Sequence, residues 1–405
     1  MANIIKFNHA IDFKSPLPNT GPKGKPLATM ANFRSMFDRI GITARYNVIS
    51  KDPEIIIPGV TPQPDNALNV ALTHIGSYAE QFGMGGLHAN KYTMAVADEN
   101  PYNPVFSWIM SEEWDNKCRI GEFLDTITTT PENNDLKQLL LLKWCLSAIA
   151  ALVEPNGISA HGVLVFQGAQ GLGKTYWFKK LVPIEMGVTQ DGMMLNLGDK
   201  DSIFQVCSKW LVELGELDAT FKKSDISQLK AFITRQTDIL RLPYAAKPSS
   251  FPRRTVFFAS VNQADFLHDD TGSRRFWVIP CTRINYLHNI NMQQFWRQVY
   301  DTLYLKGIKW TLTTEQQASL NESNKDFESI DPFAEIISDF YNWDSAPESW
   351  RWISVTAVAE EVLQRTPNKP ELSRIKGILE KMNGCRKKTL NGKRLQCIPH
   401  KAIGR

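Results

Sequence analysis

The chain has 405 residues, 43% of them hydrophobic and 22% charged, with a net charge of +4. This is the composition of a globular protein with two or three domains, and it excludes a low-complexity chain. The longest apolar segment, 139–153, is too short for a membrane span and contains Lys143, and the N-terminus lacks the apolar core of a signal peptide. Six scattered cysteines without a C-x-x-C pair argue against a zinc site and for reduced thiols in a cytoplasm.

The charge is unevenly distributed. Residues 365–405 hold twelve Lys and Arg against Glu371 and Glu380, an excess of ten, so the other 364 residues carry a net charge of −6. A basic end on an acidic body indicates a partner that is a polyanion, although a solvated charged surface would give the same count.

The N-terminal part, residues 1–130, is predicted to be mainly helical after a Pro- and Gly-rich leader. Apolar spacing predicts helices over 32–40, 65–82, 92–99, 104–110 and 121–126, and a strand over 44–49. The region has no carboxylate pair of the kind a primase or nuclease would need for metal ions. We therefore expect it to be an adaptor or oligomerisation region.

The central segment begins with an apolar helix over 136–153 and a buried strand over 162–167. The next residues fit G-x-x-x-x-G-K-[ST] and are followed by a helix, which is the context of a phosphate-binding P-loop. In a P-loop the glycines turn the backbone N–H groups toward phosphate, the lysine contacts the β- and γ-phosphates, and the hydroxyl binds Mg²⁺. ATP and Mg²⁺ are thus the expected cofactors, bound by Gly168, Ala169, Gln170, Gly171, Leu172, Gly173, Lys174, Thr175 and Tyr176.

Alternating strands and helices continue to residue 280, which predicts an α/β fold with a mostly parallel sheet. Strands are expected over 193–197, 210–214, 238–242, 255–261 and 275–279, with a helix over 224–234. The strand 210–214 ends in carboxylates that suit Mg²⁺ and a water molecule. Glu213 and Glu216 are the candidates, with Asp218 a third, and the sequence leaves open which holds the metal and which polarises water; an acidic strand edge is the structural alternative.

Two further polar elements follow. Asn262 ends an apolar strand, where it can hydrogen-bond the γ-phosphate or the water, although Asn after a strand is more often a turn residue. Arg274 and Arg275 precede the last strand, and arginine stabilises charge in phosphoryl transfer, sometimes from a neighbouring subunit. The alternative is a surface ion pair with Asp269 or Asp270.

As a set, these motifs resemble the virulence-associated protein E family, ATPases of phages, satellites and genomic islands that are similar to superfamily 3 helicases of the AAA+ class. The resemblance covers roughly residues 25–320, with matching motifs at 103–105, 114–115, 167–175, 210–217, 241–244, 252–254, 259–262 and 272–276. It implies an ATP-driven, ring-forming motor of DNA replication, a hexamer by preference, in a bacterial host cell. Because such proteins are often fused to a primase and this chain has no room for one, a primase would be a separate partner.

The resemblance also implies a hairpin before Asn262 that grips single-stranded DNA. In this segment Lys247 is placed to contact phosphate, and Tyr244 or Phe251 can stack on bases. Arg253 and Arg254 at its end are further candidate DNA contacts. An ordinary surface loop between strands is the alternative.

The basic tail predicts helices over 353–363 and 371–382, then a hairpin with Asn-Gly at its turn. Helix, turn, helix and basic hairpin resemble a winged helix, whose second helix enters a DNA groove while the wing contacts phosphates. A basic protein-binding module is the alternative. The candidate DNA contacts are Arg374, Lys376, Arg386, Lys387, Lys388, Lys393 and Arg394.

These expectations divide the chain into a region 1–130, an ATPase domain 131–310, a helical bridge 311–343 and a DNA-binding domain 344–405. The predicted activity is that of an ATP-dependent DNA helicase acting on single-stranded and duplex DNA. An ATP-switched replication initiator without unwinding activity, or a small-molecule P-loop kinase, are the alternatives.

Overall fold

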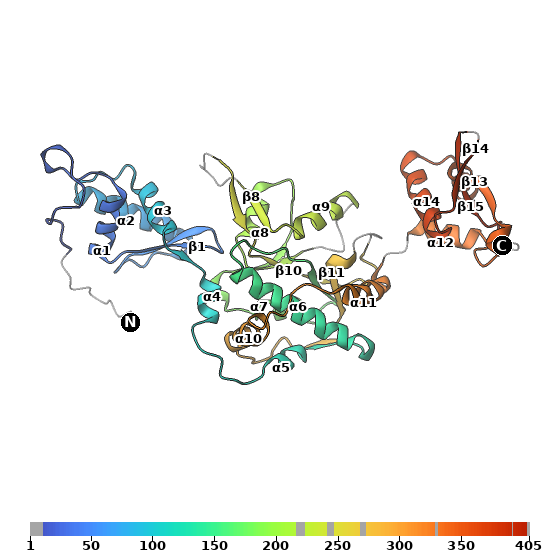
Figure 1. Cartoon of the computed structure of the whole chain (residues 1–405), viewed down its shortest axis with the longest axis horizontal. Coiled ribbons are helices and arrows are strands. Elements are labelled where there is room, and N and C mark those ends of the chain that lie inside the picture. The colour runs from blue at the N-terminus through green and yellow to red at the C-terminus, as the bar shows by residue number, and fades with distance from the viewer. Residues whose placement is uncertain are drawn as a thin grey trace. The chain divides into compact units, whose positions relative to one another are not determined.

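A computed structural model describes residues 11–215, 223–240, 247–267, 273–328, 331–390 and 392–402 (Figure 1). The chain forms two compact units. The first contains the residues up to 264 together with 271–326, and the second contains 265–270 together with 327–405.

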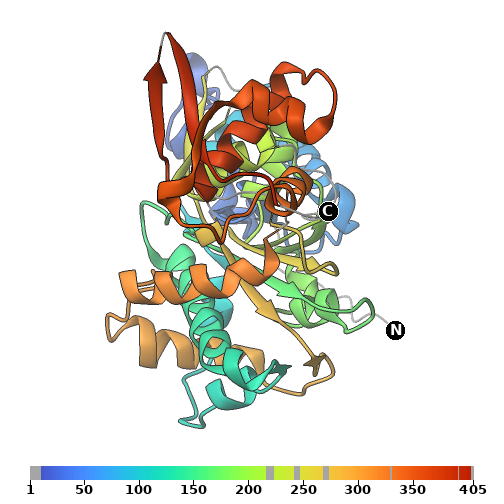
Figure 2. The same ribbon diagram turned by 90° about the vertical axis from the view of Figure 1, so that its right-hand side faces the viewer.

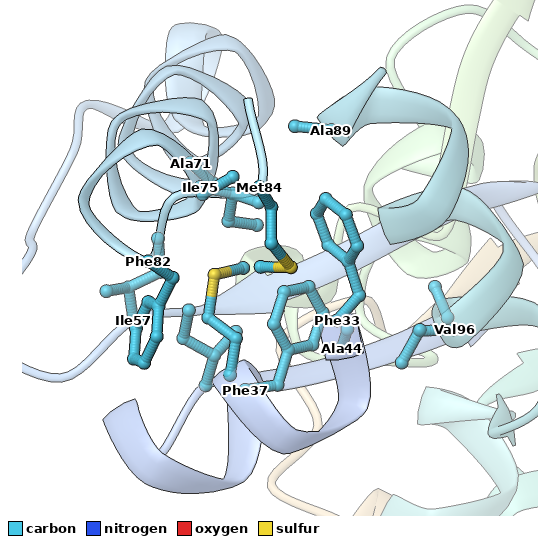
Figure 3. Close-up of a cluster of buried hydrophobic side chains, with 14 of the residues drawn as sticks. Phe33, Phe37, Ala44, Ile57, Ala71, Ile75, Phe82, Met84, Ala89 and Val96 are labelled. Atoms are coloured by element: carbon cyan, nitrogen blue, oxygen red, sulfur yellow. The ribbon is translucent and has the colours of Figure 1, made fainter. Parts of the chain in front are cut away.

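The first unit begins with a small α/β layer. Helices α1 (Met30–Ile40), α2 (Ala67–Gln81) and α3 (Ala89–Asp98) pack with a three-stranded sheet in the order β2 (Asp52–Ile56), β1 (Thr43–Asn47), β3 (Pro101–Tyr102). Phe33, Phe37, Ile75 and Phe82 belong to the buried core of this layer (Figure 3). Helices predominate here, and the sheet adds β2 and β3 to the one strand that the sequence predicted. Strand β2 was not predicted, because it begins with Asp-Pro, which strand propensity does not favour.

Helix α6 (Asn134–Val153) lies in the core of the first unit, after the short helices α4 (Pro104–Ile109) and α5 (Ile120–Leu124). Its side chains are apolar on nearly every side, and Leu141, Trp144 and Ile149 are fully buried. Residues Pro131–Val153 are long and apolar enough to cross a membrane, but 67% of the apolar window is buried inside the fold. Helices that are hydrophobic on all sides are typical of protein cores.

The centre of the first unit is a five-stranded sheet in the order β11-β5-β10-β7-β6, in which each neighbouring pair is parallel. This confirms the mixed α/β fold with a parallel sheet. The strands are β5 (Val163–Gln167), β6 (Thr189–Met193), β7 (Leu211–Leu214), β10 (Val256–Val261) and β11 (Phe276–Pro280), and the helices α7 (Lys174–Lys179), α8 (Lys200–Cys207) and α9 (Lys223–Ile233) connect them. The strand predicted over 193–197 lies earlier in the chain, because β6 ends at Met193.

Tryptophan side chains join the sheet to the helices around it. The indole N–H of Trp144 in α6 donates to the carbonyl of Phe257 in β10 over 2.7 Å, and that of Trp210 donates to Ala148 in α6 over 2.9 Å. Trp296 in α10 (Met292–Val299) donates to Leu181, just after α7, over 2.7 Å. Because buried indole N–H groups require a partner, these bonds fix the register between the layers.

Two antiparallel strand pairs and a last α-helix complete the first unit. Strand β8 (Thr237–Leu240) pairs antiparallel with β9 (Ser249–Pro252), and β4 (Ile127–Thr128) pairs with β12 (Arg283–Ile284). Helix α11 (Thr314–Asn324) begins with a capping box at Thr313. The remaining short elements described in this unit are the 3₁₀ helices Pro22–Gly24, Pro64–Asn66, Pro131–Asn133, Ile184–Met186 and Ser273–Arg275 and the π-helix Tyr300–Tyr304. The 3₁₀ helix Lys325–Phe327 falls where the two units divide, and Pro347–Ser349 belongs to the second unit.

The second unit contains helices α12 (Pro332–Phe340), α13 (Val355–Leu363) and α14 (Lys369–Met382) and a sheet in the order β13 (Arg351–Ser354), β15 (Lys393–Ile398), β14 (Lys387–Leu390). Figure 2 shows the β14–β15 hairpin standing out from the helices. Ile337 of α12 is fully buried in the core of this unit. Residues 311–343 are thus not a separate bridge, since α11 belongs to the first unit and α12 to the second.

Candidate functional site

The polar residues of the central segment meet at one edge of the five-stranded sheet. Residues 168–173, the glycine loop, follow β5, and the next strand in the sheet, β10, is followed by Asn262. Strand β7, on the other side of β10, carries Glu213. Because parallel strands end at the same edge, three segments that are distant in sequence bring their polar groups together there.

The shape of the glycine loop depends on two positions without side chains. Gly168 has a φ of 156°, and a Cβ there would lie 2.5 Å from the carbonyl oxygen of Cys281. Gly173 has a φ of 84°, and a Cβ there would lie 2.1 Å from the ring of Tyr286. Both contacts are closer than atoms allow, so the loop can adopt this course only with glycine. Tyr286 therefore lies against the end of the loop, a placement that the sequence alone did not indicate.

Lys174 is the first residue of α7, and its side chain turns back across the glycine loop. Its ammonium group donates to the carbonyls of Gly168 over 2.7 Å and Ala169 over 3.0 Å, and to the side-chain oxygen of Asn262 over 2.9 Å. Lys174 is 7% exposed. A positive charge is thus held at the loop, beside the amide of the neighbouring strand.

Glu213 is the acidic group of the site, and it is 3% exposed. Its Oε1 accepts hydrogen bonds from the hydroxyls of Thr175, over 2.8 Å, and Ser260, over 2.7 Å. A hydroxyl and a carboxylate in contact are oxygen ligands of the kind Mg²⁺ prefers. Ser260 was not among the predicted residues; its place in an otherwise apolar strand is the signal that could have found it. Glu216, the other acidic candidate, lies outside the described residues.

Arg274 and Arg275 lie at the opposite edge of the sheet. In the register of β5 with β11, Val163 pairs with Phe276 and Gln167 with Pro280. The arginines precede Phe276, whereas the glycine loop follows Gln167, so a strand length of about 16 Å separates them. Burial, and then the charges of Arg274 and Arg275, lower the pKa of His161, two residues before β5, which agrees with this placement. Neither arginine is brought to the glycine loop of its own chain.

The arginines after the β8–β9 pair are structural. The Arg253 guanidinium is buried, where it forms an ion pair with Asp238 of β8 and donates to the carbonyl of Phe232 over 2.7 Å. Arg254 donates to the carbonyls of Ala151 and Leu152, at the end of α6. The expectation that Arg253 binds DNA is wrong, because its charge is neutralised in the interior. Arg254 is likewise engaged with the backbone rather than presented to a ligand.

Lys247, at the other end of the same pair of strands, is exposed. Tyr244 lies outside the described residues. Phe251 of β9 is half-buried, and the ammonium of Lys51 lies 5.5 Å from the centre of its ring. Phe251 is therefore in contact with the turn after β1. Of the predicted DNA contacts in this segment that the structure describes, Lys247 is the exposed one.

The cations of the second unit fall into two groups. On α14, Arg374 forms an ion pair with Asp331 and lies over the ring of Phe333, and Lys376 lies 4.0 Å from Glu380. On the hairpin, the remaining candidates are exposed: Arg386, Lys387, Lys388, Lys393 and Arg394. The helix thus offers less positive charge to a partner than the hairpin does.

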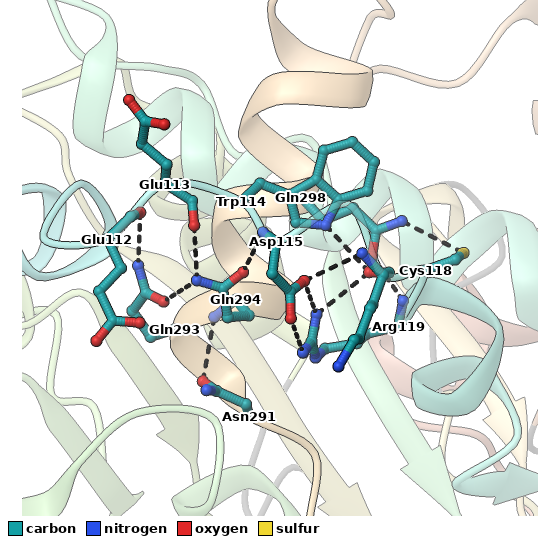
Figure 4. Close-up of polar contacts among 11 residues, drawn as sticks. Glu112, Glu113, Trp114, Asp115, Cys118, Arg119, Asn291, Gln293, Gln294 and Gln298 are labelled. Atoms are coloured by element: carbon teal, nitrogen blue, oxygen red, sulfur yellow. Dashed lines mark hydrogen bonds and ion pairs between the residues drawn. The ribbon is translucent and has the colours of Figure 1, made fainter.

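The segment that contains Trp114 and Asp115 is held on α10 by glutamine side chains (Figure 4). Gln294 donates to the carbonyl of Glu113 and accepts from the backbone N–H of Asp115, over 3.0 and 2.8 Å. Asp115 also binds Arg119 through both oxygens, which lowers the pKa of its carboxyl group. The contacts that the segment of Trp114 and Asp115 makes with α10 and Arg119 are therefore structural.

A parallel five-stranded sheet with a glycine loop, a lysine, a carboxylate and an amide at one edge defines this chain as an α/β protein with a polar site at the carboxyl ends of its strands. It belongs to the virulence-associated protein E-like family, since the model of the virulence-associated protein E-like domain matches residues 109–329, more than half of the chain. The family resemblance of the motifs is thereby confirmed.

Solved structures resemble the chain at low identity. The apo structure of the NrS-1 C-terminal region is 14% identical, with a TM-score of 0.47 over 91% of this chain and 98% of that one. An A form apo structure of the same region is 12% identical, also with a TM-score of 0.47, over 90% and 98%. Likenesses at this level carry no argument about activity. No curated protein matches the chain.

Proposed function

We propose that this protein is an ATP-dependent DNA motor of the AAA+ class, most simply a replicative helicase of a phage, satellite or other mobile element. The observation that carries the proposal is the meeting of Lys174, Thr175, Glu213 and Asn262 at the edge of the sheet beside the glycine loop. Family membership supports a role in the biology of such elements. The protein would act in the cytoplasm of the bacterial host.

The site residues have distinct parts in this proposal. The backbone N–H groups of the glycine loop and the Lys174 ammonium would bind the phosphates of ATP. Thr175 and Glu213 would hold Mg²⁺, which supplies charge neutralisation when bound. Asn262, which already reaches Lys174, would hydrogen-bond the γ-phosphate or the attacking water. Glu216 remains a candidate for polarising that water.

The positions of the two arginines determine the oligomeric assembly that we propose. Since Arg274 and Arg275 lie a strand length from their own glycine loop, they can act in phosphoryl transfer only at the site of a neighbouring copy. A closed ring, for which we favour a hexamer, would give every site such a neighbour. Lys247 would contact DNA within that ring, and a primase would be a separate protein.

The second unit would bind duplex DNA as a winged helix. Its order of α12, β13, α13, α14, β14 and β15, with the β14–β15 hairpin as the wing, supports this. The exposed wing cations would contact phosphates, as a basic wing does. Because Arg374 and Lys376 of α14 are already paired, the wing is the stronger source of charge.

The experiment that tests the proposal measures ATP hydrolysis and unwinding of a forked duplex by the full chain and by Lys174→Ala. The wild type should hydrolyse ATP, faster with single-stranded DNA, and should separate the strands. The variant should do neither while keeping its circular dichroism spectrum. Unchanged hydrolysis in the variant would disprove the nucleotide site. DNA-stimulated hydrolysis without unwinding would favour an ATP-switched initiator, and phosphorylation of a small acceptor without DNA stimulation would favour a kinase.

A further inference from the structure

The sheet of the second unit has two different faces. Ile353 of β13 and Ile398 of β15 belong to the core that the helices cover. In the register of β13 with β15, their neighbours Trp352 and Cys397 pair with one another, and side chains alternate along a strand. Trp352 and Cys397 therefore lie on the face turned away from the helices, which we call the outer face.

The outer face is basic as well as aromatic. The pairing of Lys388 with Leu395 and of Leu390 with Lys393 places these residues on it. Arg386, two residues before Lys388, shares its direction, and its guanidinium lies 5.8 Å from the centre of the Trp350 ring. The three strands contain no Asp or Glu. Among the described residues, no acidic side chain forms an ion pair with Arg386, Lys388 or Lys393.

On the opposite face of the sheet, Lys387 has an acidic partner. Lys387 lies 3.5 Å from Glu380 of α14, and Gln396 donates to the same carboxylate over 3.4 Å. Adjacent lysines at 387 and 388 thus lie in different electrostatic surroundings. Of the exposed hairpin cations, Arg386, Lys388 and Lys393 lie on the outer face, whereas Lys387 and Arg394 lie on the opposite face.

An exposed indole lies on the outer face, on the edge strand β13. Trp352 is 40% exposed, and the ammonium of Lys388 lies 4.3 Å from the centre of its ring. Leu390, on the same face, is 54% exposed. An aromatic ring among cations is the combination that binds single-stranded nucleic acid, since unpaired bases stack on the ring while the cations contact phosphates. A duplex keeps its bases stacked inside and offers no such partner along its length.

We propose that the outer face, with Trp352, Arg386, Lys388 and Lys393, is a binding surface for single-stranded DNA. A base replaces the Lys388 ammonium over the indole, because stacking on an exposed ring is worth more than an exposed cation–π contact. The released ammonium then contacts the adjoining phosphate. This surface goes beyond the duplex contacts proposed for the second unit, and it depends on the proposed function only in taking DNA as the partner.

The test measures binding of a short oligothymidine by the full chain carrying Lys247→Ala, so that the other candidate strand contact is removed. Trp352→Ala should weaken binding about tenfold, and Trp352→Phe should retain most of it, because a phenyl ring still stacks. Affinity for a blunt hairpin duplex should be unchanged in both variants. The proposal would be overturned if Trp352→Ala bound oligothymidine as tightly as its parent. It would also be overturned if this variant lost duplex binding to the same extent as oligothymidine binding.

The alternation along β14 supplies a matched control that leaves the core untouched. Lys388→Ala should reduce the slope of log affinity against log salt by about 0.7, the effect of one phosphate contact on a single strand. Lys387→Ala removes the same charge from the opposite face and should leave that slope unchanged. Equal effects of the two substitutions would show a diffuse charge effect and would also overturn the proposal. Because these measurements use no ATP, failure of the motor proposal would appear separately, as absent hydrolysis.

Discussion

The ammonium group of Lys174 donates a hydrogen bond over 2.9 Å to the side-chain oxygen of Asn262, 88 positions further along the chain. The amide therefore lies beside the group that would contact the terminal phosphates. We expect Asn262→Ala to bind ATP with near-normal affinity and to hydrolyse it about a hundredfold more slowly, the effect of losing one polar group that acts on the transition state. Steady-state hydrolysis against ATP concentration measures both quantities. Gln263→Ala, at the exposed next residue, is the control, and equal rates for the two variants would contradict the assignment.

Glu213→Gln tests the charge at the site without changing its shape. The amide oxygen can still accept from Thr175 and Ser260, so the fold and ATP binding should persist. Hydrolysis should fall by two orders of magnitude or more, of the order seen when a group that stabilises developing charge is removed, and saturation should require more Mg²⁺. Ser260→Ala, which removes one hydrogen bond to the carboxylate, should lower the rate only a few-fold. A Mg²⁺ titration of the hydrolysis rate distinguishes these outcomes, and full activity of Glu213→Gln would contradict a role for this carboxylate.

Shared sites can be detected by mixing two inactive chains. Arg275→Ala leaves its own glycine loop intact, and Lys174→Ala leaves its own arginines intact. If the arginines act on a neighbour, mixed assemblies contain complete sites, and hydrolysis should reappear on mixing and rise with total protein concentration. The same mixture made with a Lys174→Ala, Arg275→Ala double variant in place of the single lysine variant is the control, since it restores no complete site. Arg274→Ala, tested in the same way, shows which arginine reaches the neighbour.

Removing one partner of the buried ion pair beside the β8–β9 pair should destabilise the fold strongly. Asp238→Asn leaves the Arg253 guanidinium charged and without its counterion in the interior. We expect a loss of about 3–5 kcal/mol in the free energy of unfolding. Glu322→Gln breaks the exposed ion pair with Lys325 and should cost less than about 1 kcal/mol. Urea unfolding of the two variants gives the comparison, and similar losses would show that the buried pair is not special.

Lys51 should make stability depend on pH. Burial lowers the pKa of its ammonium group to about 8, so the unfolded chain holds this proton more tightly. The charged lysine therefore costs stability at neutral pH, and this cost disappears as the pH rises from about 8 to the ordinary lysine pKa. Lys51→Met should be more stable than the wild type at pH 7, by up to about 3 kcal/mol, and should lose that advantage near pH 10. Thermal melts at both pH values measure it, with the exposed Lys91→Met as the control.

Sequence patterns located the centre of the site because its signals are local. An apolar strand, a glycine loop and a helix follow one another directly at residues 162–179, and a carboxylate on an apolar strand predicts Glu213. The strand over 189–193 was placed too late, because Thr-Gln-Asp-Gly-Met has no apolar alternation and only pairing with β7 makes it a strand. Intrinsic strand propensity is a weak guide where hydrogen-bonded pairing with a neighbouring strand determines the structure.

The sequence shows which residues are charged, but it does not show which of them form ion pairs in the folded protein. Arg253 was predicted to bind DNA beside other basic residues, and its partner Asp238 lies fifteen positions earlier. Arg374 was assigned to a DNA groove, and its partner Asp331 is the N-cap residue of a different helix, α12. Such pairings depend on how β8 meets β9 and on how α12 meets α14, which no spacing along the chain reveals. Trp352 was missed for the same reason, since its exposure follows from the sheet register.

The separation of Arg275 from its own glycine loop has a genetic consequence. In the proposed ring, a copy without this arginine still binds nucleotide and still joins its neighbours, yet it disables the site next to it. When this copy is expressed in a cell that also carries the normal gene, it would inactivate mixed assemblies in proportion to the amount of it that is present. A null allele would remove only its own product. The substitution should therefore be dominant over the wild type, and a mobile element that encoded it could suppress the replication of a related element in the same host.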